Sequence, residues 1–334
     1  MNKLSSFELF WLMFMLYDSP YALMLLHYLA QAQGLLAAEM MILAAFLGQA
    51  VLYMAVKRAE QNLQVNAKPN LFLKMYFYLS AVIITAIFAE MLAAEFLNLT
   101  PKWAIALLFL VPSVYLAFKN MRNIAYLSVL LLPLSLIGYV MLFLGNAESF
   151  SLMNILPFAQ DNARFFFSLA HILPFVMQGA VLMVLYRELA APECALKVSS
   201  WALWSNIFLL LGEYILSCGV FGAEESARLL FLPIELARIL RIGDALLRVE
   251  VFSVWHWTIA GVLSTALFLD LAAGSVEKEA ARRKIIFLAL ALWLVVAIFD
   301  DVTAVNFLFE IGIVVSVGAM AGLIKQKRSG RREK

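Results

Sequence analysis

Long apolar runs recur along the whole chain, and each is bounded by charged residues, Asn, Gly or Pro. A bilayer core about 30 Å thick needs about 20 apolar residues per helix, so the runs predict about ten membrane helices. We therefore expect an all-α, polytopic membrane protein with a single transmembrane domain over residues 1–324. The expected spans are 6–30, 35–56, 71–95, 103–119, 123–145, 164–187, 198–219, 251–272, 284–299 and 303–324.

Composition supports a membrane protein and excludes most soluble classes. Hydrophobic residues make up 64% of the chain and charged residues 14%, whereas soluble domains carry about 25% charged residues. The net charge of +2 indicates neither a strongly acidic nor a strongly basic partner. Nucleic-acid binding is not expected, because there is no basic patch before the tail at 325–334.

The distribution of Lys and Arg predicts the orientation. With ten spans, nineteen of the 25 basic residues fall on the side of the N-terminus. Because basic residues concentrate in cytoplasmic loops, both termini are expected in the cytoplasm, with 325–334 as a basic cytoplasmic tail.

Two connections are longer than the rest, and both fall on the predicted outer side. They are 146–163 and 220–250. Within the second, apolar residues recur between charges from 234 to 248, a pattern typical of amphipathic helices. Segment 220–250 is therefore predicted to form a short amphipathic helix pair that covers the outer face as a lid.

Two of the spans contain polar breaks next to a proline. The first carries Asp18, Ser19 and Pro20 in the middle of an apolar run. The sixth carries Ser168, His171, Pro174, Gln178 and Gly179. Unpaired backbone groups cost several kcal/mol in hydrocarbon, so an interrupted helix is tolerated only against protein or a wet cavity. These eight residues are the candidate ligand-binding residues, although each proline could also simply kink its helix.

The two breaks occupy corresponding positions if the chain is an inverted repeat. Residues 6–145 would form the first repeat and 164–324 the second, which makes the first and sixth spans equivalent. Paired interrupted spans are the best sequence indication of a transporter's midplane site.

Several ionisable side chains fall inside predicted spans, where a charge costs a few kcal/mol. Asp18 is the deepest, and it could bind a ligand cation, bind a coupling ion or proton, or cap local backbone donors. Glu90, Glu213 and Glu310 are candidate coupling or buried charges. His256, between two tryptophans, is interpreted as an interfacial residue.

Sequence motifs of enzymes are missing from the chain. It has no phosphate-binding glycine loop, no HExxH zinc motif, no nucleophile elbow and no paired-cysteine metal site. We therefore expect no catalytic residues, no metal and no cofactor.

Residues 231–269, FLPIELARILRIGDALLRVEVFSVWHWTIAGVLSTALFL, resemble the signature of the spore germination permease family. The residues that carry the resemblance are Pro233, Arg238, Asp244, Arg248 and Glu250. The resemblance implies a LeuT-type 5+5 inverted-repeat fold of the amino acid-polyamine-organocation superfamily, with broken helices 1 and 6. It also implies a permease-like subunit that binds a nutrient germinant, often an amino acid, beside a larger membrane subunit and a lipoprotein subunit in the inner spore membrane.

The chain departs from that family pattern at both breaks. Asp18 stands where a small residue is usual, and Met177-Gln178 replaces a frequent Gly-Glu pair. A carboxylate beside the binding backbone would repel a ligand carboxylate unless it is protonated or paired. The ligand is therefore expected to be an amine, a zwitterion bound through its ammonium, or an uncharged solute.

Three functions remain open on the sequence. The first is a germinant-receptor subunit that binds a small nutrient at the midplane and signals to partner subunits. The second is a free-standing, proton- or sodium-coupled amino acid or amine permease. The third is a structural membrane scaffold whose breaks are only kinks.

Overall fold

The protein is helical throughout its described residues. The computed structural model describes residues 3–31, 34–65, 71–119, 121–155, 165–240, 250–274, 278–298 and 302–325. Within these ranges the elements are helices, apart from one isolated bridge between Leu4 and Leu189. The basic tail at 326–334 lies outside the described residues.

The long helices coincide with the ten predicted apolar runs. They are α1 (Ser6–Tyr17) with α2 (Pro20–Ala30), α3 (Gly34–Val65), α4 (Leu71–Glu95), α5 (Lys102–Ala117), α6 (Met121–Gly145), α8 (Phe165–Val176) with its continuation to Glu188, α10 (Ala195–Phe221), α13 (Glu250–Ala273), α14 (Lys278–Ile298) and α15 (Val302–Lys325). Short helices α7 (Leu152–Ile155), α11 (Ala223–Ser226) and α12 (Leu232–Ile239) lie in the two long connections. The second helix expected in the lid falls in 241–249, outside the described residues.

Seven of the described helical segments are long and apolar enough to cross a membrane, and the bent pair α1 and α2 adds an eighth when it is counted as one span. Helix α5 is shorter, with 16 residues, and α14 carries Arg282, Arg283 and Lys284 near its start. The structure therefore establishes a multi-pass helical protein. The count of ten spans and the inverted repeat stay predictions.

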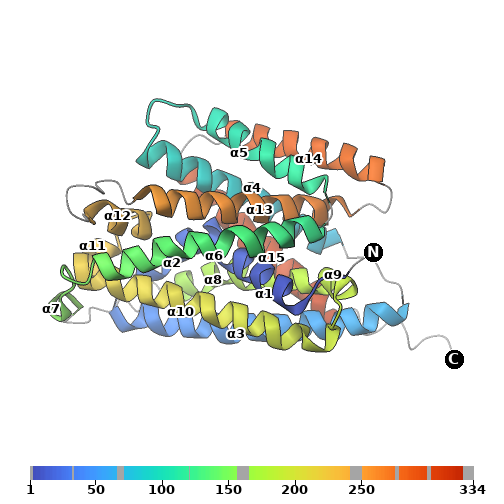
Figure 1. Cartoon of the computed structure of the whole chain (residues 1–334), viewed down its shortest axis with the longest axis horizontal. Coiled ribbons are helices and arrows are strands. Elements are labelled where there is room, and N and C mark those ends of the chain that lie inside the picture. The colour runs from blue at the N-terminus through green and yellow to red at the C-terminus, as the bar shows by residue number, and fades with distance from the viewer. Residues whose placement is uncertain are drawn as a thin grey trace.

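The first span runs through the interior of the bundle. Figure 1 shows α5 and α14 along one edge and α3 and α10 along the opposite edge, with α6 and α13 between them. Helix α1 packs on α10 and α6, and α2 packs on α8 and α4. Every residue of α2 except His27 is buried. The break between α1 and α2 is therefore surrounded by protein, as a break inside a membrane requires.

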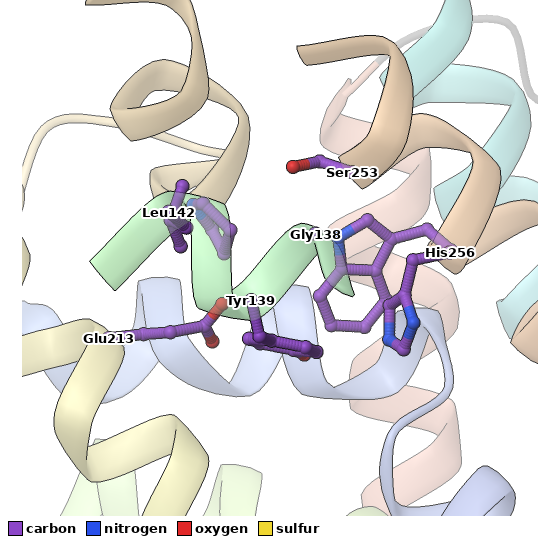
Figure 2. A pocket seen from close by; sticks show the side chains of 8 residues that line it. Gly138, Tyr139, Leu142, Glu213, Ser253 and His256 are labelled. Carbon is purple, nitrogen blue, oxygen red and sulfur yellow. The ribbon is translucent and has the colours of Figure 1, made fainter. Parts of the chain in front are cut away.

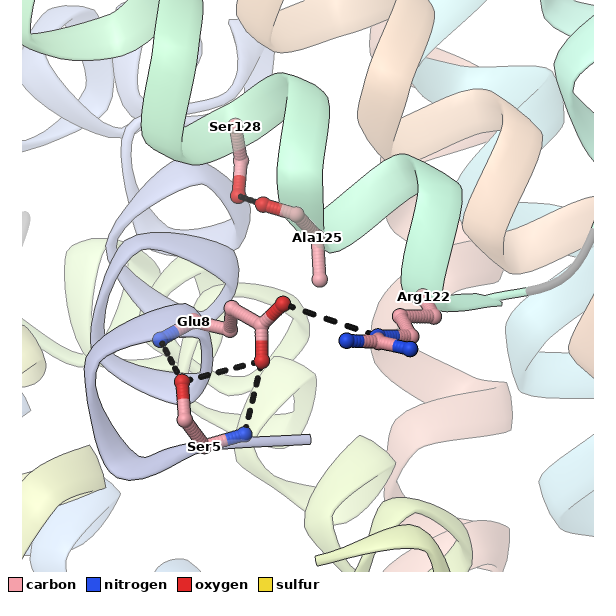
Figure 3. Close-up of polar contacts among 5 residues, drawn as sticks. All are labelled: Ser5, Glu8, Arg122, Ala125 and Ser128. Carbon is pink, nitrogen blue, oxygen red and sulfur yellow. Dashed lines mark hydrogen bonds and ion pairs between the residues drawn. The ribbon is translucent and has the colours of Figure 1, made fainter. Parts of the chain in front are cut away.

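The beginning of α1 is fixed by side chains. Ser5 caps the helix: its Oγ accepts from the amide of Glu8 at 3.2 Å, and Glu8 Oε2 accepts from the Ser5 amide at 2.7 Å. The other carboxylate oxygen of Glu8 lies 3.8 Å from Arg122 Nε on α6 (Figure 3). This reciprocal cap satisfies two backbone donors that the first helical turn leaves free.

A short backbone bridge joins the N-terminal residues to the end of the sixth span. The Leu4 amide donates to the Glu188 carbonyl at 2.7 Å, and the Ala190 amide donates to the Leu4 carbonyl at 2.8 Å. The start of the first span and the end of the sixth are thereby held side by side.

Candidate functional site

The break predicted in the first span is confirmed. Helix α1 ends at Tyr17, the Ser19 backbone is extended, and Pro20 begins α2, so that the two helices are bent by 47°. Proline favours this arrangement because its fixed φ suits the first turn of a helix and it has no amide proton to leave unpaired there.

The carboxylate of Asp18 is fully buried and has two protein partners. Tyr139 of α6 donates its hydroxyl to Oδ1 at 2.8 Å, and His256 Nε2 of α13 lies 2.7 Å from Oδ2. Of the three roles that the sequence left open for Asp18, the local cap is not seen, because Oδ1 accepts from Tyr139 and Oδ2 faces His256. The interfacial interpretation of His256 is wrong: its side chain is 2% exposed, because the register of α13 turns it toward the bundle interior.

At the break predicted in the sixth span the helix changes type, but Ser168–Glu188 still counts as a single span, and only the first span is bent into a pair of helices. Helix α8 contains Pro174 and ends at Val176, and the chain continues as a 3-10 helix, η2 (Met177–Val181), then α9 (Leu182–Leu185) and η3 (Tyr186–Glu188). Every residue of η2 is buried. Such a change of helix type often marks a hinge or a functional site.

The two breaks pack directly on each other. The ring of Tyr17 lies 5.4 Å from that of Phe175, measured between centroids. A Cβ atom added to Gly179 would stand 2.7 Å from Tyr17 Oη and 3.1 Å from a methyl of Leu52. Glycine is therefore required for this close approach. The structure brings together the two segments that the sequence marked as a pair.

Buried polar groups without partners gather at these breaks. Among the described residues, Tyr17 Oη, Ser19 Oγ and both side-chain atoms of the Gln178 amide have no hydrogen-bond partner. Leaving a buried polar group unpaired costs about 1–3 kcal/mol. A concentration of such groups is a reason to expect a solute or water between the breaks.

Two other candidates of the sixth span engage a different neighbour. Ser168 donates to the Tyr28 carbonyl at 3.1 Å, and the ring of His171 lies 3.9 Å from that of Tyr28 and stacks on Phe309. Tyr28 in turn donates to Asn306 of α15 at 2.7 Å. These residues connect α8, α2 and α15. They are not part of the group of unpaired polar atoms around Gln178.

The remaining charged candidates have different environments. Glu213 of α10 is 1% exposed, and Figure 2 shows it extending toward Tyr139. Glu90 is 4% exposed and pairs with Lys102 at 2.6 Å. Glu310 is exposed, so the expectation of a buried charge there is wrong: its position on α15 faces away from the core.

A small cavity lies next to the Asp18 cluster. It is lined by Gly138, Tyr139, Leu142, Glu213, Pro233, Ser253, His256 and Trp257. The space open to the centre of a water molecule is about 10 Å³, which corresponds to roughly one water. Figure 2 shows lining residues of α6, α10 and α13, and Pro233 adds a fourth helix, α12.

Helix α12 contributes to the wall of the cavity and is held to α4. Pro233, near its start, lines the cavity. Arg238 pairs with Glu95 at the end of α4 and with Glu235, and its guanidinium lies 5.4 Å from the centre of the Phe96 ring. Glu250 is buried, whereas Asp244 and Arg248 lie outside the described residues.

We expect Arg238→Ala to loosen α12. The guanidinium is about one-third exposed, so solvent screening limits the pairs to about 1 kcal/mol. That difference corresponds to about fivefold faster amide exchange, measurable over 232–239 by hydrogen–deuterium exchange. Arg228→Ala, which removes exposed pairs within one segment, is the control and should leave that exchange unchanged.

The chain was compared with known proteins and protein families. The spore germination protein family matches residues 69–316, about three-quarters of the chain. The chain belongs to this family. The matched region of this spore germination protein runs from α4 into α15 and includes α12, Glu213 and the break in the sixth span, whereas the break at Asp18 precedes it. No curated protein matches the chain.

Membership agrees with the multi-pass helical structure and confirms the resemblance carried by Pro233, Arg238 and Glu250. Spore germination permeases are not a class of enzymes. Family membership identifies a permease-like membrane protein connected with germination. It does not identify the solute or the signal.

Proposed function

We propose that this protein is the permease-like subunit of a spore germination receptor and that it binds a small nutrient between the breaks of its first and sixth spans. In this proposal ten spans form a LeuT-type arrangement of two inverted repeats. Binding shifts a conformational equilibrium that a larger membrane subunit and a lipoprotein subunit read. Both termini lie in the cytoplasm.

The observation that supports the nutrient site is the contact of the two breaks together with their unpaired polar groups. Gly179 approaches Tyr17 closely, and the Gln178 amide is buried without a partner among the described residues. A kink alone needs neither feature. The structural scaffold therefore has less support than a solute-binding protein.

The same groups favour a neutral or zwitterionic solute such as an amino acid. Tyr17, Ser19 and Gln178 offer neutral hydrogen-bonding groups. In contrast, Asp18 Oδ1 accepts from Tyr139, and Oδ2 lies 2.7 Å from His256 Nε2. An amine bound by Asp18 would first have to displace His256. A zwitterion can use the amide and hydroxyl groups without breaking that pair.

The test is ligand-dependent thermal stabilisation of the purified full-length protein against amino acids, amines, sugars and nucleosides. A ligand at 100 times its Kd stabilises the native state by about 2.7 kcal/mol. Gln178→Leu keeps the side-chain size and removes the unpaired amide, so we expect at least about tenfold weaker binding, equivalent to one good hydrogen bond. Gln61→Leu, an exposed glutamine on α3, is the control.

Several outcomes would contradict the proposal. Equal stabilisation of the Gln178→Leu variant would place the solute elsewhere. Solute uptake by the purified protein in liposomes, without partner subunits, would identify a free-standing coupled permease with the same site. Absence of stabilisation by any compound, in the protein alone and with co-expressed subunits, would favour the scaffold.

A further inference from the structure

Glu213 stands apart from the other acidic residues of the bundle. It lies midway along α10, is 1% exposed, and neither carboxylate oxygen has a hydrogen-bond partner among the described residues. Glu90, the comparable buried glutamate, has Lys102 at 2.6 Å. Removing an ionised carboxylate from water without a partner costs so much that such a group takes up a proton instead.

The groups that face Glu213 add no positive charge unless His256 is protonated. They are Asp18 at the end of α1, Tyr139 of α6 and His256 of α13. His256 Nε2 lies 2.7 Å from Asp18 Oδ2. Among the described residues, no hydrogen bond reaches either oxygen of the Glu213 carboxylate.

Charged groups on the neighbouring helices are engaged elsewhere. Arg238 of α12 binds Glu95 and Glu235, and Glu224 and Glu225 of α11 pair with Arg228. On α3, Lys57 pairs with Glu60 and Glu39 is exposed. His27 of α2 lies 2.9 Å from the Leu229 carbonyl. These charged groups therefore have partners other than Glu213 or are exposed.

The cavity beside Glu213 is suited to a proton and its water more than to a metal ion. It has room for roughly one water molecule. Oxygen ligands in its lining come from Glu213, Tyr139 and Ser253, fewer than the six or more that hard cations such as Ca²⁺ or Mg²⁺ take. The described residues contain no group of three or more His, Cys, Asp and Glu side chains that could hold a metal ion.

We infer that Glu213 is a proton-binding residue, which is protonated in this closed arrangement and gives its proton to water when α12 moves away from the cavity. The proton leaves the carboxyl oxygen and the carboxylate remains, with no other bond formed or broken. Pro233 of α12 forms part of the cavity wall, so movement of α12 changes the access of Glu213 to outside water. The inference goes beyond nutrient binding and needs no ligand to be known.

Infrared spectroscopy of the purified, lipid-reconstituted protein tests this directly. A protonated carboxyl group has a carbonyl stretch separate from that of a carboxylate. We expect such a band at neutral pH, and we expect Glu213→Gln to remove it. Glu90→Gln is the matched control and should leave the band in place, because Glu90 is paired with Lys102.

Three results would overturn the inference. The first is a band that survives Glu213→Gln. The second is a wild-type spectrum without any carboxylic acid band. The third is loss of the band on adding NaCl at constant pH, which would make Glu213 part of a sodium site. If Glu213→Gln does not fold, Arg238→Ala replaces it: loosening α12 should speed exchange of this carboxyl proton in D₂O several-fold, and an unchanged rate would also overturn the inference.

The dependence of stability on pH is a second, independent measurement. If the native state holds one proton that the unfolded chain releases, stability falls as the pH rises, by about tenfold in the unfolding equilibrium per pH unit. Glu213→Gln should flatten this dependence by one proton in thermal unfolding measured from pH 6 to 8. An unchanged slope would contradict a resident proton, and neither experiment involves the nutrient site.

Discussion

Asp18→Ala is expected to destabilise the protein by about 1–3 kcal/mol for each buried polar group that loses its neighbour, the usual cost of leaving such a group unpaired. The substitution leaves the Tyr139 hydroxyl and His256 Nε2 without their shared acceptor in a fully buried site. Thermal unfolding in detergent at fixed pH measures the loss. Arg122→Ala is a suitable comparison, because its pair with Glu8 is partly exposed and 3.8 Å long, and such pairs contribute about 0–1 kcal/mol.

A double-mutant cycle decides whether the pair itself is responsible. If Asp18 and His256 act together, the loss in Asp18→Ala/His256→Phe will be smaller than the sum of the single losses by more than about 0.5 kcal/mol. Additive losses would instead mean that each residue contributes through separate packing.

Gly179→Ala is expected to cost about 1–3 kcal/mol, in the range of overpacked interiors. The new methyl group would stand 2.7 Å from the hydroxyl of Tyr17. That ring is fully buried against Phe175 and cannot turn aside. Because the substitution pushes the two breaks apart, it should also reduce any nutrient-dependent stabilisation.

Gly138→Ala is the matched control in the same bundle. A Cβ atom at Gly138 would meet Phe252 at 3.5 Å, an ordinary contact, and alanine raises helix propensity by about 1 kcal/mol over glycine. We therefore expect a neutral or stabilising effect in the same unfolding assay. Equal destabilisation by both substitutions would show that the approach of the two breaks is not special.

The positions of the helices were predictable, because an apolar run near 20 residues leaves little alternative to a membrane helix. The interruption at Pro20 was also predictable: proline fixes the local backbone and Asp18 and Ser19 precede it. Near Gln178 the same reasoning predicted a break, whereas the span continues and changes to a 3-10 helix over Met177–Val181.

The partners inside the site were not predictable from the sequence. Tyr139 and His256 lie 121 and 238 positions from Asp18, and their meeting depends on how three helices pack. Apolar residues flank both Tyr139 and His256 in the sequence, so no polar helix face predicts the direction of either side chain. The same ambiguity made Glu310 look buried. The signature around Pro233 indicated the family, yet it contained no information about the cavity that Pro233 lines.

The hydrogen bonds between Leu4 and the chain at Glu188 and Ala190 have a mechanical consequence. They connect the start of the first span to the end of the sixth, so we expect these two ends to move together. We therefore expect any separation of the first and sixth spans to be larger away from this bridge than beside it. A bulky tag fused directly before Leu4 would strain that joint, and fusions intended to preserve the motion need a flexible spacer.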